Sequence, residues 1–269
     1  MSTSLKLTAV AITTALFAST VQAQIVLYSE PFNSGFTVGT SLVGSAGQGG
    51  GWFSSQRPQP PATNVAETSV AAQIQNIVGN PGNAVRFQTG GVSRQTTYWD
   101  DFAIDLDFAG QNNVRTSFDV FRTAPTFAPG PPMSTAYLAG LFNDSFVAHF
   151  LFGVDDLGQL AFVTNSGPTT TANTSIPLDQ WSTITAIANF NTRLVTFEIN
   201  GVPVDLAPVS MITGTGSIVA DMDLQFIPAS VAAISDIAYV DNLLVTIPEP
   251  ATLGLIAGSA MLVLRRRSR

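Results

Sequence analysis

The stretch NNVRTSFDVF, residues 112–121, decides the fold of this chain. Its side chains alternate in character, with Val114, Thr116, Phe118 and Val120 on one side and Arg115, Ser117, Asp119 and Phe121 on the other. Successive side chains of an extended chain point to opposite faces, so such alternation predicts a β-strand with one face in a core.

Other stretches repeat this period of two. FVAHFLFGV (146–154) gathers Phe146, Ala148, Phe150, Phe152 and Val154 on one face, and DMDLQFI (221–227) alternates Met222, Leu224 and Phe226 with Asp221, Asp223 and Gln225. Turn sequences such as Asn200-Gly201 separate these runs, and residues 24–246 contain neither an internal repeat nor a long linker. The pattern predicts an all-β fold, a single jelly-roll-like antiparallel β-sandwich.

The composition excludes several classes of protein. Cysteine is absent, so the chain has no disulfide framework and no thiolate site. Of 11 basic residues, five are Lys6 and the terminal Arg265, Arg266, Arg267 and Arg269, which leaves 6 against 18 acidic residues. A body this acidic repels phosphate, so nucleic acid is not an expected partner.

The N-terminus has the layout of an export signal. Lys6 precedes an apolar run over residues 7–18, and Val21-Gln22-Ala23 follows. This order predicts a signal peptide over residues 1–23, which signal peptidase cleaves after Ala23 to leave Gln24 first. The alternative is a buried N-terminal helix.

The C-terminus, IPEPATLGLIAGSAMLVLRRRSR (247–269), ends in an apolar run followed by arginines. Residues 251–264 are uncharged and would span about 21 Å as a helix, which is short for a bilayer core of about 30 Å. The arginines would hold this end on the cytoplasmic side. We predict a short transmembrane helix that anchors the chain transiently in the inner membrane, since an apolar hairpin or core helix would not explain the arginines.

Three parts of this tail carry a family resemblance: Pro248-Glu249-Pro250, the apolar run, and Arg265, Arg266 and Arg267. Together they resemble the PEP-CTERM sorting signal of Gram-negative bacteria. The resemblance implies that an exosortase, a membrane-embedded transpeptidase-like enzyme, cuts near Pro-Glu-Pro and releases the body to the outer surface or the exopolysaccharide matrix. Such tails follow very different bodies, some of them ice-binding, so the signal predicts location and not activity.

A second resemblance concerns the body, residues 24–246. IPLDQWSTITAIANFNTRLVTFEINGVPV (176–204) is similar to a hairpin of concanavalin-like and laminin-G-like jelly rolls, in which a tryptophan, here Trp181, opens a strand and an Asn-Gly turn follows the next. The fold implied by this resemblance pairs the first and last strands and brings Glu30 close to Asp241. Carboxylates and nearby carbonyls suit Ca²⁺, so these two residues are our candidate ligands for structural calcium.

Three further features bear on chemistry. Tyr98-Trp99 is the best candidate for an exposed aromatic pair on which sugar rings could stack. Asp105 with Asp107, and Asp221 with Asp223, are spaced to share strand faces, and we interpret both pairs as solvated side chains of an acidic sheet. His149 is the only histidine, so a multi-histidine metal site is excluded. It is expected to be an ordinary sheet residue.

These features predict a secreted, exosortase-processed surface or matrix protein that is not an enzyme, with polysaccharide binding as the leading hypothesis. One alternative is an extracellular glycan hydrolase or lyase that uses paired aspartates. The other is a structural matrix subunit without a ligand. No catalytic residue is assigned.

Overall fold

A computed structural model describes residues 24–45, 51–58, 72–76, 82–88, 94–123, 136–155, 157–171, 174–212, 214–227 and 237–249. Residues Gln24–Pro248 form one compact unit. The predicted signal peptide with Ala23, and the tail with Pro250, Arg265, Arg266 and Arg267, lie outside the described residues. Within the described ranges, no helix has the length and apolar character that a membrane span requires.

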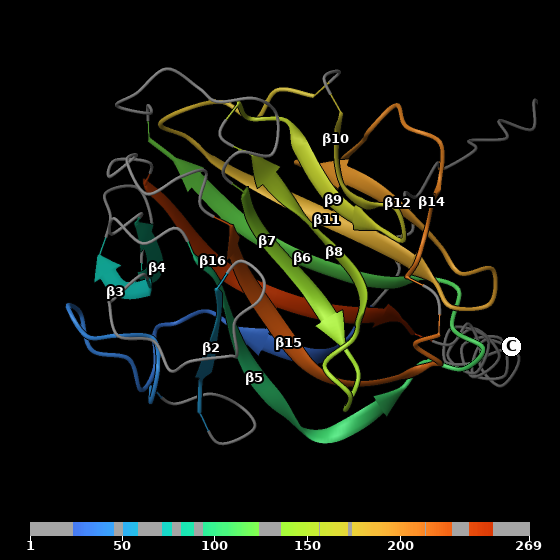
Figure 1. Ribbon diagram of the computed structural model, residues 1–269, viewed down its shortest axis with the longest axis horizontal. Helices are drawn as coiled ribbons and strands as arrows, with labels where there is room; N and C mark the ends of the chain where they lie inside the picture. The colour runs from blue at the N-terminus through green and yellow to red at the C-terminus, as the bar shows by residue number, and fades with distance from the viewer. Residues whose placement is uncertain are drawn as a thin grey trace, which may run out of the picture. The chain divides into compact units, whose positions relative to one another are not determined.

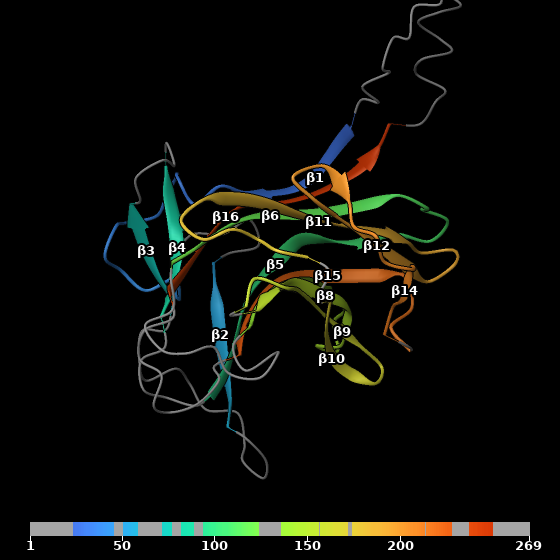
Figure 2. The same cartoon turned by 90° about the horizontal axis from the view of Figure 1, so that it is seen from above.

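The compact unit consists of two antiparallel sheets (Figures 1 and 2). The first sheet has nine strands in the order β13 (Val202–Pro203), β12 (Leu194–Ile199), β11 (Trp181–Asn189), β6 (Val114–Arg122), β16 (Ile237–Pro248), β4 (Asn83–Gln88) and β3 (Ala72–Asn76), with β1 (Gln24–Glu30) paired to β16 and β14 (Val209–Ser210) paired to β12.

The second sheet has seven strands, in the order β10 (Gly167–Thr171), β9 (Leu160–Thr164), β8 (Ala148–Asp155), β7 (Ala136–Phe142), β15 (Ile218–Ile227), β5 (Arg94–Asp107) and β2 (Phe53–Pro58). Figure 2 shows this sheet lying beneath the first one, as the second layer of a sandwich. The predicted all-β fold, a jelly-roll-like antiparallel sandwich, is therefore confirmed.

The core lies between the two sheets and follows the predicted alternation. In β6, every second residue from Val114 to Arg122 is buried, and the residues between them are half-buried. The ring centroid of Phe118 in β6 lies 5.4 Å from that of Phe152 in β8, which joins the two layers. Both rings are almost fully buried.

One expected strand face is only partly correct. Phe150, Phe152 and Val154 of β8 point into the core as predicted, but Ala148 packs in a smaller hydrophobic cluster away from it and Phe146 is exposed in a turn. The register between β7 and β8 shifts after Leu141, so that Leu141 faces Phe150 while Phe142 faces Ala148. His149 is therefore an extra residue in β8, and it reverses the side to which the preceding side chains point.

Candidate functional site

The face of the seven-stranded sheet that points away from the core, its outer face, carries two aspartates at its middle. Met222, Leu224 and Phe226 of β15 pack in the core, so the intervening Asp221 and Asp223 lie on the outer face. The strand register places Asp223 opposite Trp99 of β5 and Asp221 opposite Asp101. Next along, Trp99 is opposite Phe53 of β2.

Three aromatic side chains, Phe53, Trp99 and Phe146, form what we call the aromatic cluster. The rings of Phe53 and Trp99 are stacked with centroids 5.8 Å apart, and Phe146 meets Trp99 edge-on at the same distance. Phe53 is 45% exposed and Phe146 55%, while Trp99 is half-buried. These are large apolar surfaces to leave in water, and an exposed apolar patch commonly marks a binding site.

The aromatic cluster bridges over β15. Trp99 belongs to β5, and Phe146 belongs to the turn between β7 and β8; β15 lies between β5 and β7 in the sheet. The contact between the two rings therefore crosses the strand that carries Asp221 and Asp223 on the same face. The aromatic cluster and the two buried aspartates therefore lie on the same face of the sheet.

The turn that presents Phe146 has a strained backbone. Phe146 has a φ of 56°, in the left-handed region that a bulky residue rarely adopts. Asn143 holds the turn, because its side-chain oxygen accepts hydrogen bonds from the amides of Ser145 and Val147, both at 3.0 Å. Strain of this kind costs about 1–3 kcal/mol and concentrates at functional sites. An exposed phenylalanine kept at such a position points to a use for its ring.

The aspartate pair shares a buried environment. Asp221 and Asp223 are 2% and 1% exposed, and their carboxyl groups hydrogen-bond to each other. Burial raises the pKa of Asp221 to about 6, and the charges of Asp101, Asp144 and Asp105 act in the same direction. Burial, followed by the charge of Asp221, also raises the pKa of Asp223. Two adjacent buried carboxyl groups resist ionising together, so the pair retains a proton at pH values above the ordinary pKa of an aspartate.

This burial corrects the interpretation of Asp221 and Asp223 as solvated side chains. Periodicity identified the face of β15 correctly, but it could not reveal the rings that cross that strand. The other pair behaves as expected, because Asp105 and Asp107 are both exposed near the end of β5. The Ser217 hydroxyl and the Ala109 amide donate hydrogen bonds to Asp107 and lower its pKa.

The structure separates the predicted aromatic pair. Tyr98 is fully buried in the core, with its ring centroid 5.8 Å from that of Phe87, so the expectation that it is an exposed stacking residue is wrong. Adjacent residues of a strand point to opposite faces, so only one of the two side chains could reach the outer face. Trp99 does so. Its partners Phe53 and Phe146 were missed, because no local pattern brings them together.

The predicted pairing of the first and last strands is present. β1 pairs antiparallel with β16, which places Glu30 opposite Leu243 and near Asp241. Sequence reasoning missed Asp100 of β5, which is fully buried and accepts a hydrogen bond from the Tyr28 hydroxyl at 3.1 Å. Burial, with the charges of Asp100 and Asp241, raises the pKa of Glu30 to about 7 even though the Phe32 amide donates to it.

The carboxyl groups of Glu30 and Asp241 already accept hydrogen bonds from backbone amides. The Asn242 amide donates to Asp241 at 2.7 Å, and the Phe32 amide to Glu30 at 2.9 Å. Among the residues that the structure describes, no three acidic or histidine side chains are grouped so as to hold a metal ion. Structural calcium at Glu30 and Asp241 thus stays a prediction, without a described set of side-chain ligands.

His149 behaves as a sheet residue. It is fully buried next to the register shift, its Nε2 donates to the Ile218 carbonyl at 2.8 Å, and its ring packs 5.4 Å from that of Phe190. Burial lowers the pKa of this histidine to about 4, so the imidazole is neutral at physiological pH. The packing of the ring and its hydrogen bond to a backbone carbonyl therefore agree with the prediction that His149 is an ordinary sheet residue.

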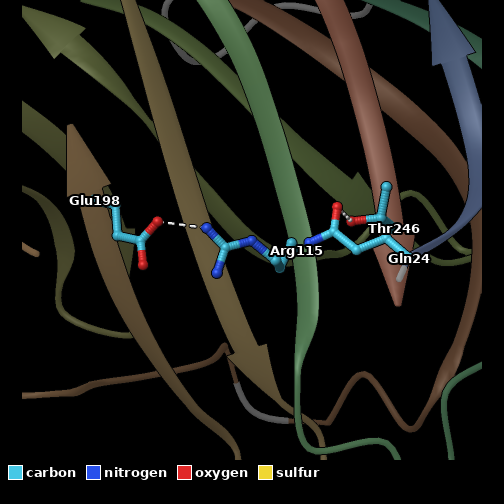
Figure 3. A network of polar contacts seen from close by, with 4 residues as sticks. All are labelled: Gln24, Arg115, Glu198 and Thr246. Atoms are coloured by element: carbon cyan, nitrogen blue, oxygen red, sulfur yellow. Dashed lines mark hydrogen bonds and ion pairs between the residues drawn. The ribbon is translucent and has the colours of Figure 1, made fainter. Parts of the chain in front are cut away.

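The described residues predicted to take part in processing lie at one end of a strand pair. Gln24, the first residue of β1, is opposite Pro248, the last residue of β16, and Glu249 follows directly. The Thr246 hydroxyl donates to the Gln24 side chain at 3.4 Å (Figure 3). Figure 3 also shows Arg115 of β6 paired with Glu198 of β12, an ion pair on the same sheet. Ile247 and Pro248, which the sequence placed in the tail, thus extend the last strand.

Comparisons with known proteins do not assign a family. No family model matches the chain, and no curated protein matches it. Among solved structures, it is similar to a conserved carbohydrate esterase from the Shiga toxin-encoding bacteriophage phi24B, with 15% identity and a TM-score of 0.48 over 84% of this chain and 100% of that one.

Two further similarities are of the same kind. Domain 4 of an extracellular arabinanase from Geobacillus stearothermophilus, solved in complex with arabinotriose, shares 15% identity and a TM-score of 0.45 over 84% of this chain and 93% of that domain. A sialidase shares 8% identity and a TM-score of 0.47 over 67% of this chain, which spans only 16% of the sialidase. Similarities this distant do not indicate a function for this chain. The residues of the outer face are the basis for inferring one.

Proposed function

We propose that this chain is an exported, exosortase-processed surface or matrix protein whose sandwich binds polysaccharide without cleaving it. The observation that carries the binding proposal is the aromatic cluster on the outer face of the seven-stranded sheet. Sugar rings pack on flat aromatic surfaces, and Phe53, Trp99 and Phe146 offer such surfaces from three separate elements. The strained turn that holds Phe146 supports a functional use of that ring.

The processing proposal is supported by where the last strand ends. β16 runs to Pro248, so the sequence Pro248-Glu249-Pro250 begins at the last residue of the last strand, without a linker between them. A cut after this point would leave the pairing of β1 with β16 intact. Mass spectrometry of the native protein is expected to find an N-terminus at Gln24 and no terminal arginines. A mature chain that still ends in Arg267-Ser268-Arg269 would contradict processing.

Loss of the Trp99 ring is expected to weaken binding of oligosaccharides at least about tenfold, equivalent to about 1.4 kcal/mol, because stacking on the indole is lost. The measurement is binding of the full chain and its Trp99→Ala variant to an array of neutral, amino and acidic oligosaccharides. Trp181→Ala is the matched control, since Trp181 is a half-buried tryptophan on the other sheet. An array that stays silent for the wild-type chain, or equal losses in both variants, would contradict the proposal.

The glycan hydrolase or lyase remains the second candidate, and the aspartate pair favours it. One carboxyl that keeps its proton beside one that can lose it provides a general acid and a general base. Binding is preferred because Asp221 and Asp223 are 2% and 1% exposed, whereas acid-base groups must reach the substrate. A polysaccharide that the wild-type chain cuts and the Asp223→Asn variant does not cut would establish the enzyme instead.

A further inference from the structure

The border of the aromatic cluster is strongly acidic. Asp101 lies opposite Asp221 on the neighbouring strand, and Asp144 lies in the turn that carries Phe146. Both are exposed, as is Asp105 further along β5. The charged groups that act on Asp221 are all carboxylates, so this part of the described surface has a negative potential.

Two polar atoms beneath the cluster lack a hydrogen-bond donor. The Oδ1 atoms of Asp221 and Asp223 are buried on the outer face, in residues that are 2% and 1% exposed, and neither has a hydrogen-bond partner among the residues that the structure describes. Buried acceptors of this kind cost about 1–3 kcal/mol each when left unsatisfied. They lie on the same face as the aromatic cluster but are closed to solvent, so the acceptors that an arriving donor can reach are the exposed carboxylates at the border of the cluster.

We propose that the aromatic cluster recognises a glycan that carries protonated amino groups, of the glucosamine type. This inference rests on the proposed function and specifies its ligand. A sugar ring would stack on Trp99 while its ammonium group donates to Asp101 and Asp144. An ammonium group carries three donors and no acceptor, and it is attracted both to carboxylates and to aromatic faces. The site thus combines the two kinds of group that such a sugar needs.

Other ligands satisfy the site less completely. A neutral glycan would gain the stacking but leave the carboxylates without a counter-charge. A uronate polymer would be repelled by Asp101, Asp144 and a chain of net charge −7. A lysine-rich peptide would pair with the carboxylates but has no rigid ring to cover the aromatic cluster.

The test compares four probes on the full chain. These are a glucosamine oligomer, its fully N-acetylated counterpart, a uronate oligomer of matched length and a lysine-rich peptide of matched charge. Binding is measured by calorimetry at mildly acidic pH, where amino sugars carry their protons. The glucosamine oligomer is expected to bind at least about tenfold more tightly than the other three, and its affinity should fall as salt rises because salt screens exposed charges.

Variants separate the charge contribution from the stacking contribution. Asp101→Asn combined with Asp144→Asn should reduce glucosamine binding about tenfold and leave binding of the N-acetylated oligomer unchanged. Asp205→Asn is the matched control, because Asp205 is exposed and lies outside the outer face. Neither affinity should change in that variant.

The outcomes also distinguish this inference from the proposed function. Equal affinity for the free-amine and N-acetylated oligomers, with both lost in Trp99→Ala, would overturn the inference and leave polysaccharide binding standing. Peptide binding that is as tight as glucosamine binding and indifferent to Trp99→Ala would overturn the inference in favour of a basic protein partner. No affinity for any oligosaccharide would contradict both.

Discussion

Replacing Phe152 with alanine is expected to lower the free energy of unfolding by about 3–5 kcal/mol. The side chain is fully buried, and its ring lies 5.4 Å from Phe118, 6.0 Å from Phe150 and 6.2 Å from Phe197. Truncation removes apolar burial and leaves a cavity between the two sheets, which the packed strands can close only in part. A domain of ordinary stability has about 5–15 kcal/mol to lose.

Urea unfolding measures this effect, with the slope of the transition used to check that both proteins expose a similar surface. Phe146→Ala is the matched control, because it removes the same ring from the same stretch of sequence at a site that is 55% exposed. The control should cost less than about 1 kcal/mol, as most exposed substitutions do. Equal losses in both variants would mean that β8 does not bury the face described.

Substitution of Asp223 by asparagine is expected to stabilise the fold at neutral pH by up to about 3 kcal/mol, because it replaces one of two buried carboxyl groups that resist ionising together with a neutral amide. The pKa of Asp221 is about 6 in the folded chain and 3.8 in the reference state. A carboxyl with a raised pKa lets the fold keep its full stability below the unfolded value and costs stability as the pH rises toward the folded value. For Asp221 this loss is about 3 kcal/mol, at about 1.36 kcal/mol per pH unit.

The asparagine amide can donate to Asp221 without needing a proton, so the decline in stability between pH 4 and 6 should become shallower in the variant. Unfolding free energies at pH values across this window provide the measurement. Asp107→Asn is the control, because hydrogen bonds from Ser217 and Ala109 lower the pKa of that exposed carboxyl. A variant that loses stability at neutral pH, with an unchanged pH profile, would contradict a proton shared by the aspartate pair.

The candidate site was only partly predictable. Local alternation identified Asp221 and Asp223 as neighbours on one face, and the prediction of Tyr98-Trp99 as an aromatic pair included Trp99. That prediction paired Trp99 with the wrong residue, since Tyr98 belongs to the core. Phe146 could not be identified at all, because its exposure depends on the register shift between β7 and β8. Asp100 was missed for a similar reason, since its neighbours Tyr28 and Glu30 are about 70 residues away in the sequence.

The sequence by itself determined the period of each strand and hence the division of side chains between core and outer face, as in residues 114–122. That division is local, because the geometry of an extended chain sets it within a few residues. Only the tertiary structure decided which strands are neighbours: the order β5, β15, β7 brings Trp99 and Phe146 together on the face that carries Asp223. Strand pairing depends on contacts between distant residues, and no short stretch of sequence contains both partners.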